Sequence, residues 1–265
     1  MYAFEYHRAA DVADAVAELK RVTESKPLAG GMTLLPTCKM RLAAPSELVD
    51  LGAIAALKGI AVADAHVTIG AMTRHADVAA SQELRAALPA LCDLAAGIGD
   101  PQVRNRGTMG GSVANDDPAA DYPSACLALA AIIVTDRREI AADDYFQGLF
   151  QTALEEDEII TAIRFPRPVC AAYEKFKNPA SRYATVGVFV ARFDDGVRVA
   201  VTGAGADGVF RASEIEQALS ADFSPEAAAA ITISPDAIAS DMHGSAEYRA
   251  HLIPILAARA VEACK

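Results

Sequence analysis

The sequence predicts an α+β protein that divides near residue 168, and three observations support this class. Helical and strand-like periodicities alternate irregularly through the first 165 residues. The segment Arg164–Cys170 (RFPRPVC) has two prolines within three residues, which force an extended link. Beyond that link, strand-like runs come first and helical runs come last, the order typical of an α+β region. We therefore expect one domain over residues 1–168 and a second over 169–265.

The elements expected in the first region are short. Asp11–Lys20 has apolar residues at helical spacing, with Asp11 as a candidate N-cap. The other helices are expected at 34–40, 75–79, 83–87, 89–96 and 122–131. Strands are expected at 2–6, 26–29, 47–50, 59–62, 66–70, 132–135, 137–140 and 159–165.

The second region begins with strands at 171–177, 186–193 and 197–202. The run Asp194-Asp195-Gly196 is typical of a hairpin turn between the last two of these strands. Helices follow at 212–221, 225–231 and 245–264.

Composition excludes several classes of function. The 265 residues carry a net charge of −11, with 52% hydrophobic and 22% charged residues. A nucleic-acid-binding protein or a protein docked on an anionic membrane needs a basic face, so neither partner is expected. No apolar run reaches the roughly 18 residues of a membrane span, and the N-terminus lacks an apolar signal core. We expect a cytoplasmic protein.

The cysteines are scattered and odd in number. None forms the paired spacing of an iron–sulfur or zinc site. We therefore expect free, mostly buried thiols in a reducing compartment at all five positions: Cys38, Cys92, Cys126, Cys170 and Cys264.

Two glycine turns are the most informative local features. The segment Arg104–Pro123 contains Gly107, Gly110 and Gly111 and hardly any bulky apolar side chain, so we expect a loop whose backbone approaches a ligand. The upstream segment Leu28–Pro36 (LAGGMTLLP) contains a second Gly-Gly turn. Each pair of glycines is followed by a hydroxyl, and backbone amides in such turns can hold an anion. Together the turns predict one extended, phosphate-bearing ligand.

Two nucleotide-binding alternatives lack support. Neither turn continues into the GK[ST] sequence of a nucleotide-hydrolysing P-loop. The segment Gly203–Gly208 fits GxGxxG, but too few residues follow it for the further βα units of a doubly wound sheet. We expect these glycines to form a turn between a strand and a helix.

Paired motifs resemble one known family. LAGGMTLLP, together with DPQVRNRGTMGGSVANDDPAADYP, is similar to the FAD-binding medium subunits of the molybdenum hydroxylases, of the carbon monoxide dehydrogenase and xanthine dehydrogenase type. The segment Thr73–Val78 (TRHADV) and the C-terminal YEKFKNPASRYATVG add to the resemblance, which covers nearly the whole chain.

The resemblance implies an FAD-binding domain of two small α/β subdomains, related to the vanillyl-alcohol-oxidase (PCMH) type, over about 1–55 and 56–168. A C-terminal α+β domain follows it. The family's pyrophosphate-binding turn carries over to Leu28, Ala29, Gly30, Gly31, Met32 and Thr33. Met32 stands where the family usually has a polar residue, so a backbone contact would survive there and a side-chain contact would not. The second turn carries over to Thr108, Gly110, Gly111, Ser112 and Asn115.

The resemblance also assigns four single positions. Asp121 would accept hydrogen bonds from ligand hydroxyls, although as an alternative it could cap the helix that follows. Ile98 would be an apolar cover against the flavin ring. Lys175 and Tyr183 would contact the flavin, with a surface lysine and a boundary aromatic as the respective alternatives.

Three side chains near these motifs are expected to stay outside the site. We expect Asp116 and Asp117 to be solvated, and Arg211 to be a surface charge rather than a contact near the adenine end.

The resemblance implies the function of an electron relay. Substrate would be oxidised on a large molybdopterin subunit, and electrons would pass through a small [2Fe–2S] subunit to FAD and on to an external acceptor. The expected assembly is a heterotrimer, itself dimerised, and this chain would supply neither a catalytic acid or base nor a metal ligand. Two alternatives stay open: a stand-alone FAD-dependent oxidoreductase of a related fold, and a non-enzymatic nucleotide-binding or scaffold module.

Overall fold

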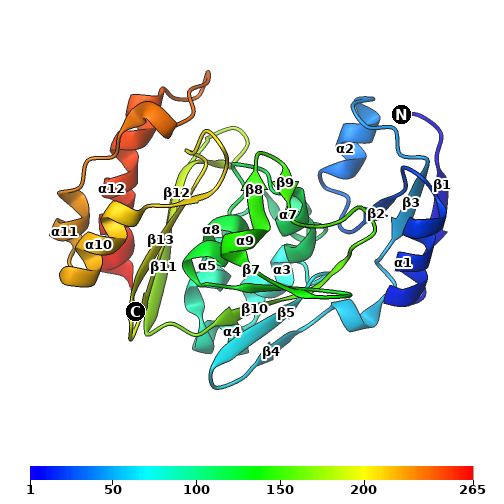
Figure 1. Ribbon diagram of the computed structural model, residues 1–265, viewed down its shortest axis with the longest axis horizontal. Helices are drawn as coiled ribbons and strands as arrows, with labels where there is room; N and C mark the ends of the chain where they lie inside the picture. Colours follow the sequence, from blue (N-terminus) through cyan, green and yellow to red (C-terminus); the bar gives the residue numbers. More distant parts are fainter. Residues whose placement is uncertain (265) are drawn as a thin grey trace.

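Three β-sheets follow one another along the long axis of the molecule, each with its own helices (Figure 1). The computed structural model describes residues 1–264. The first sheet lies near the N-terminus, the second in the middle and the third beside the C-terminal helix (Figure 1). This is the α+β class that the sequence predicts. No helix among residues 1–264 is both long enough and apolar enough to cross a bilayer.

The N-terminal sheet is small and parallel, with the order β1-β3-β2. The Asp11 side chain accepts from the amide of Asp14, so the predicted N-cap is confirmed, and Ala15 and Leu19 pack against Val49 in a local core. The first strand starts later than predicted, because Tyr2 is exposed and finds no pairing partner until Glu5 meets Glu47. The elements are β1 (Glu5–Arg8), α1 (Val12–Arg21), β2 (Lys26–Leu28), α2 (Leu34–Lys39), β3 (Glu47–Asp50) and a 3₁₀ turn, Ala55–Leu57.

The middle sheet is antiparallel, with the order β4-β5-β10-β6-β7. Its strands are β4 (Ile60–Val62), β5 (His66–Gly70), β6 (Ile132–Thr135), β7 (Glu139–Ala141) and β10 (Ile160–Pro166), and a separate hairpin joins β8 (Phe146–Gly148) to β9 (Gln151–Thr152). Its helices are α3 (His75–Ala80), α4 (Gln82–Ala87), α5 (Pro89–Ala96), α6 (Pro101–Arg104), α7 (Met109–Asn115), α8 (Tyr122–Ala128) and α9 (Ala142–Tyr145).

The prediction of a loop over the whole of Arg104–Pro123 is wrong, because α7 lies inside this segment. Thr108 caps α7, accepting a hydrogen bond from the amide of Gly111 at 3.2 Å. Neither Gly110 nor Gly111 adopts a positive φ. The helix tolerates these residues because the missing Cβ of Gly110 leaves room for Ala71, and a methyl group there would overlap that residue.

The C-terminal sheet is antiparallel, in the order β11-β12-β13-β14, with three helices on one side (Figure 1). The predicted hairpin at Asp194-Asp195 is confirmed, with Phe193 opposite Gly196. The strands are β11 (Cys170–Lys177), β12 (Ala184–Phe193), β13 (Gly196–Thr202) and β14 (Phe210–Arg211), and the helices are α10 (Ser213–Ala221), α11 (Pro225–Ala229), a 3₁₀ turn Pro235–Ala237 and α12 (Ala246–Ala263). The GxGxxG glycines lie between β13 and β14, so a strand follows them before any helix does.

Strand β12 joins the second and third regions, because its two faces belong to different cores. Val186, Val188 and Val190 pack toward α12, whereas Phe189 and Ala191 pack into the core of the middle region. This alternation follows from the two-residue period of a strand. Helix α8, buried along its whole length, packs against β12 and β13 from the middle region.

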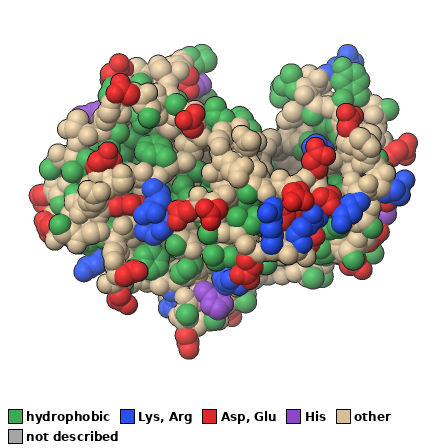
Figure 2. All heavy atoms as spheres, in the orientation of Figure 1, with side chains coloured by type: hydrophobic (Ala, Val, Ile, Leu, Met, Phe, Trp, Pro, Cys, Tyr) green, Lys and Arg blue, Asp and Glu red, His purple; other side chains and the backbone are tan. Residues whose placement is uncertain are grey.

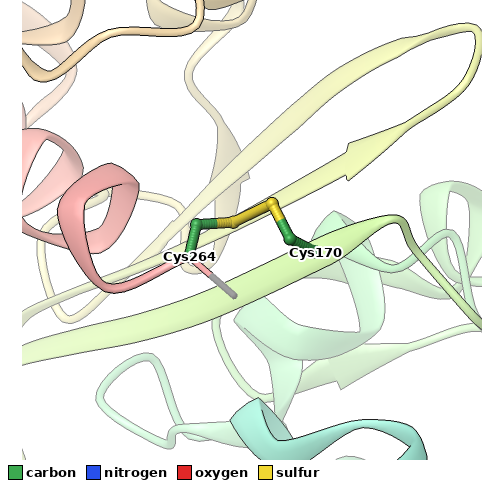
Figure 3. Close-up of a disulfide and its surroundings, with 2 residues drawn as sticks. All are labelled: Cys170 and Cys264. Atoms are coloured by element: carbon green, nitrogen blue, oxygen red, sulfur yellow. A yellow bond between two sulfur atoms is a disulfide. The ribbon is translucent and has the colours of Figure 1, made fainter.

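The prediction of five free thiols is wrong for two of the cysteines. Cys170, at the start of β11, forms a disulfide with Cys264, at the end of α12, with their Cα atoms 5.5 Å apart (Figure 3). The two residues are 94 positions apart, so no local spacing could signal the pair. They meet because α12 packs along β11. Among the described residues, Cys38, Cys92 and Cys126 are free and buried, as predicted.

Candidate functional site

A cleft of about 640 Å³ opens between the N-terminal and middle regions. The turn between β2 and α2 forms one wall and α7 forms the other. The loop that contains Ser181, Arg182 and Tyr183, from the C-terminal region, closes one end. Figure 2 shows the surface hollowed between the two lobes at the top of the molecule. A cleft of this size is in the range of small-molecule and cofactor sites.

The cleft brings together most of the residues that the sequence singled out. Thirteen of the fifteen line it: Ala29, Gly30, Gly31, Met32, Thr33, Ile98, Thr108, Gly110, Gly111, Ser112, Asn115, Asp121 and Tyr183. The other two do not. Leu28 is part of β2, where it pairs with Asp50, and Lys175 is buried behind the cleft wall.

The two glycine turns touch each other directly. A methyl group on Gly30 would overlap the carbonyl oxygen of Arg106, just before the second turn. A methyl group on Gly111 would come within 2.9 Å of Thr108 Oγ1 and 3.3 Å of Ala29 Cβ. The glycines thus allow close approach of backbone to backbone, in addition to any approach of a ligand.

The first turn supplies the hydrogen-bond donors of the cleft. Within residues 1–264, the amides of Gly30, Gly31, Met32 and Thr33 donate no hydrogen bond to another protein atom. Gly31 has φ +71°, a conformation that glycine adopts without strain. Consecutive free amides in such a turn form a concavity for an anion.

The second turn differs, because its amides are already used. Gly110 N donates to Ala71 O at 2.8 Å, and Gly111 N donates to Thr108 Oγ1. What this turn offers is side chains: in the described part of the chain, the Ser112 hydroxyl and the Asn115 amide have no protein hydrogen-bond partner. The expectation that both turns present backbone amides is therefore correct for the first turn alone.

A buried network of hydrogen bonds holds the Asp121 side chain in place. Its carboxylate accepts from Lys175 Nζ at 3.0 Å and from the Tyr173 hydroxyl. Lys175 also donates to Gly97 O at 2.9 Å and to Arg182 O at 3.1 Å, so its ammonium group is fully engaged. The alternative interpretation of Lys175 as a surface lysine is wrong, since its side chain is 7% exposed.

Asp121 also occupies the N-cap position of α8, as the alternative interpretation expected. Its side chain makes no capping hydrogen bond to α8. Burial raises the pKa of this carboxyl, while the Lys175 ammonium and the Tyr173 hydroxyl act to lower it. The network joins the middle region to β11 and fixes one carboxylate at the cleft surface.

Asp116 is buried, which contradicts the expectation that it is solvated. It is 2% exposed, its backbone is left-handed at φ +44°, and Oδ1 has no partner among the described residues. Burial raises the pKa of Asp116 to about 7, and the neighbouring Asp117 adds to the shift. Asp117 lines the cleft itself, and burial raises its pKa as well.

His75 is among the lining residues that sequence reasoning did not assign to the site. It is buried, its ring lies 5.4 Å from that of Tyr122, and Nδ1 has no partner within residues 1–264. Burial, followed by the positive charge of Arg104, lowers the pKa of His75 to about 4, so the imidazole is neutral. The TRHADV segment contains His75, but a lone histidine in a short helix has no diagnostic spacing that would assign it to the cleft.

Two predicted residues, Ile98 and Tyr183, add an aliphatic and an aromatic side chain to the lining of the cleft. Ile98 follows α5, and its backbone is fixed by a hydrogen bond from Arg104 to Ile98 O at 2.8 Å. Tyr183 is 46% exposed in the loop that closes the cleft. Arg211 lies elsewhere and forms an ion pair with Glu216 at 2.7 Å, as expected for a residue outside the site.

Comparisons with known proteins agree with this geometry. The family profile described as "FAD binding domain in molybdopterin dehydrogenase" matches residues 2–168. The chain is similar to the carbon monoxide dehydrogenase medium chain of Afipia carboxidovorans, with 40% identity over 99% of this chain and 96% of that relative. It is also similar to the nicotine 6-hydroxylase medium subunit of Paenarthrobacter nicotinovorans, with 37% identity over 98% of this chain and 96% of that relative.

A solved structure extends the comparison to three dimensions. A chain of reconstituted CO dehydrogenase from Oligotropha carboxidovorans superposes with a TM-score of 0.91 and 37% identity, over 98% of this chain and 97% of that one. Both the sequence and the fold therefore match along nearly the full length. The chain belongs to the family of FAD-binding medium subunits of molybdenum hydroxylases, and it is the flavoprotein subunit of an oxidoreductase whose cofactor is FAD.

Proposed function

We propose that this chain is an electron relay in a cytoplasmic heterotrimer, itself dimerised. FAD would receive electrons from the [2Fe–2S] clusters of a small subunit and pass them to an external acceptor. Substrate would be oxidised at the molybdopterin centre of a large subunit. The single observation that carries this proposal is the set of free amides at Gly30–Thr33 in the cleft, opposite a wall of neutral side chains.

The residues of the cleft fit FAD in three sections. The amides of the first turn would hold the pyrophosphate through backbone dipoles, without a lysine or arginine at each phosphate. Ser112, Asn115 and Asp121 would bind ligand hydroxyls. Ile98 and Tyr183 would cover the flavin ring. FAD supplies the redox chemistry when bound, and the protein supplies binding, orientation and the local electrostatics.

Two titratable side chains of the cleft, His75 and Asp121, are not placed for acid–base catalysis on an organic substrate. His75 is a neutral, buried imidazole, and the carboxylate of Asp121 is occupied by Lys175 and Tyr173. A general base must reach a substrate proton, and neither group is free to do so. Because the chain is an FAD-binding subunit of an oxidoreductase, the alternative of a non-enzymatic nucleotide-binding or scaffold module is rejected.

We also propose the domain boundaries that the sequence suggested. Residues 1–168 would form the FAD-binding domain, with subdomains over about 1–55 and 56–168, and 169–265 the C-terminal domain. The buried residues form three cores, one at each main sheet, which supports this division, while Ile159 joins the N-terminal core and Phe189 the middle core across the proposed boundaries. Limited proteolysis should cut first between these units.

The experiment that tests the relay compares the FAD-loaded chain alone with the chain assembled with its two partner subunits. A panel of aldehydes, purines, N-heterocycles and carbon monoxide is added anaerobically, and flavin absorbance is followed. We expect bleaching in the assembled complex and none in the isolated chain. Bleaching of the isolated chain by an organic substrate would support the stand-alone oxidoreductase instead.

A further inference from the structure

Three ligand-type side chains converge at the end of the molecule remote from α12, where α1 packs on β3 and β2 (Figure 1). They are His7 on β1, Glu18 on α1 and Glu47 at the start of β3. One nitrogen or oxygen atom from each lies within 4.8 Å of the other two. None of the three lines the cleft, so the relay function does not use them.

Glu47 is the member of this cluster that a simple ion-pair network does not explain. Its residue is 5% exposed, and its Oε2 is buried without a hydrogen-bond partner among residues 1–264. A buried carboxylate oxygen without a partner is costly unless a cation or a proton neutralises it.

The local charge is unbalanced. Asp14, Glu18 and Glu47 bring three carboxylates to this cluster; Arg21 pairs with Glu18 and approaches Glu47, and His7 pairs with Asp14. Arg21 forms a close ion pair with Glu18, but its nearest approach to Glu47 is 3.8 Å. Its side chain is 66% exposed, so it can turn out into water at little cost.

The position of His7 suits metal binding. Its Nε2 lies 3.1 Å from Asp14 Oδ2, which also accepts from the amide of Ala10 at 2.8 Å. A carboxylate on one ring nitrogen fixes the tautomer and raises the basicity of the other nitrogen, an arrangement typical of histidines that bind metals. Asp14 thus holds the His7 ring in place beside Glu18 and Glu47.

We propose that His7, Glu18 and Glu47 form a binding site for one divalent transition-metal ion of the zinc type, with water completing the coordination. One imidazole and two carboxylates suit zinc and its neighbours better than calcium or magnesium. Metal–ligand bonds of about 2.0–2.2 Å place tetrahedral ligands ~3.5 Å apart, so the side chains need to close in by ~1 Å. The ion would join α1 to β1 and β3 and would neutralise Glu47.

The test titrates the full-length, untagged, FAD-loaded chain with Zn²⁺ after treatment with a chelator, using isothermal titration calorimetry and thermal unfolding. We expect one Zn²⁺ bound per chain and a rise in Tm. The variants His7→Ala and Glu47→Gln should each lose about tenfold or more in affinity. Because the His7 side chain is partly exposed, His7→Ala keeps the test valid if Glu47→Gln fails to fold.

Two control variants separate a metal site from an ion-pair cluster. His251→Ala removes an exposed histidine on α12 and should leave Zn²⁺ affinity unchanged. Arg21→Ala removes the cation that competes for Glu18 and should tighten Zn²⁺ binding, whereas in a plain ion-pair cluster it would only destabilise the fold. No stoichiometric uptake by the wild type, equal uptake by His7→Ala and Glu47→Gln, or weaker binding by Arg21→Ala would overturn the proposal.

Discussion

Replacing Lys175 with methionine should destabilise the fold without emptying the cleft. The Lys175 ammonium donates to Asp121, to Gly97 O and to Arg182 O, and the side chains of the Lys175–Asp121 pair are 7% and 5% exposed. Removing one partner of a buried ion pair leaves the other charge uncompensated, which costs about 3–5 kcal/mol. We therefore expect Lys175→Met to lower the free energy of unfolding by about that amount at pH 7.

The loss of stability caused by Lys175→Met should depend on pH. Without Lys175, the buried carboxyl of Asp121 has a pKa raised further above its unfolded value, because burial already raises it and the lysine opposes that shift. Such a group stabilises the folded state when protonated, and this contribution disappears as the pH rises through the folded pKa. The difference in the free energy of unfolding between the wild type and Lys175→Met should therefore decrease as the pH falls toward 5.

The assay is urea unfolding of both apoproteins at pH 5, 6, 7 and 8, with FAD affinity measured by flavin fluorescence. Lys177→Met, an exposed lysine on the same strand, is the matched control and should change stability by less than about 0.5 kcal/mol. In the double variant Asp121→Asn, Lys175→Met, part of the stability should return, because no unpaired charge remains. A loss below about 1 kcal/mol, or a difference that does not depend on pH, would refute the reasoning.

Three further predictions follow from the same structure. Gly30→Ala adds a methyl group that overlaps Arg106 O and pushes the two turns apart. We expect FAD affinity to fall at least about tenfold and the free energy of unfolding to fall by about 1–3 kcal/mol. Unchanged FAD titration and urea unfolding curves would contradict this prediction. Cys264→Ser should lower stability to guanidinium by about 2–4 kcal/mol by opening the link to Cys170, and dithiothreitol should do the same to the wild type but nothing to the variant. The folded pKa of Asp116, about 7, lies above its unfolded value, so the wild type should lose stability as the pH rises from about 4 to 7. Asp116→Asn should not show this loss, and parallel curves of stability against pH for the two proteins would contradict the prediction.

Local periodicity was enough to predict much of the fold. The bounds predicted for β3, β5 and α5 agree with the structure, and the hairpin at Asp194-Asp195 followed from turn chemistry. The loop prediction over 104–123 was wrong because glycine disfavours helices on its own. There the Thr108 cap and the contact of Gly110 with Ala71 compensate, and the second of these is a tertiary contact.

The candidate site was predictable to the extent that it depends on motifs. The two turns and most of the residues carried over from the family meet in one cleft, but Leu28 and Lys175 do not line it. What the sequence could not show is how distant segments share the polar groups. Two of the three hydrogen bonds that Lys175 donates, to Gly97 O and to Asp121, reach segments far away in the chain. Asp116 is shielded from solvent because the hairpin β8–β9 lies against it, with Phe150 N donating to Asp116 O.

An experimental structure of the chain with FAD bound would test whether the first turn holds the pyrophosphate. We expect pyrophosphate oxygens at hydrogen-bond distance, about 2.7–3.2 Å, from the amides of Gly30–Thr33, with the flavin ring beside Ile98 and Tyr183. A pyrophosphate held by other residues, or amides of the first turn that bond to protein atoms in the loaded state, would contradict it.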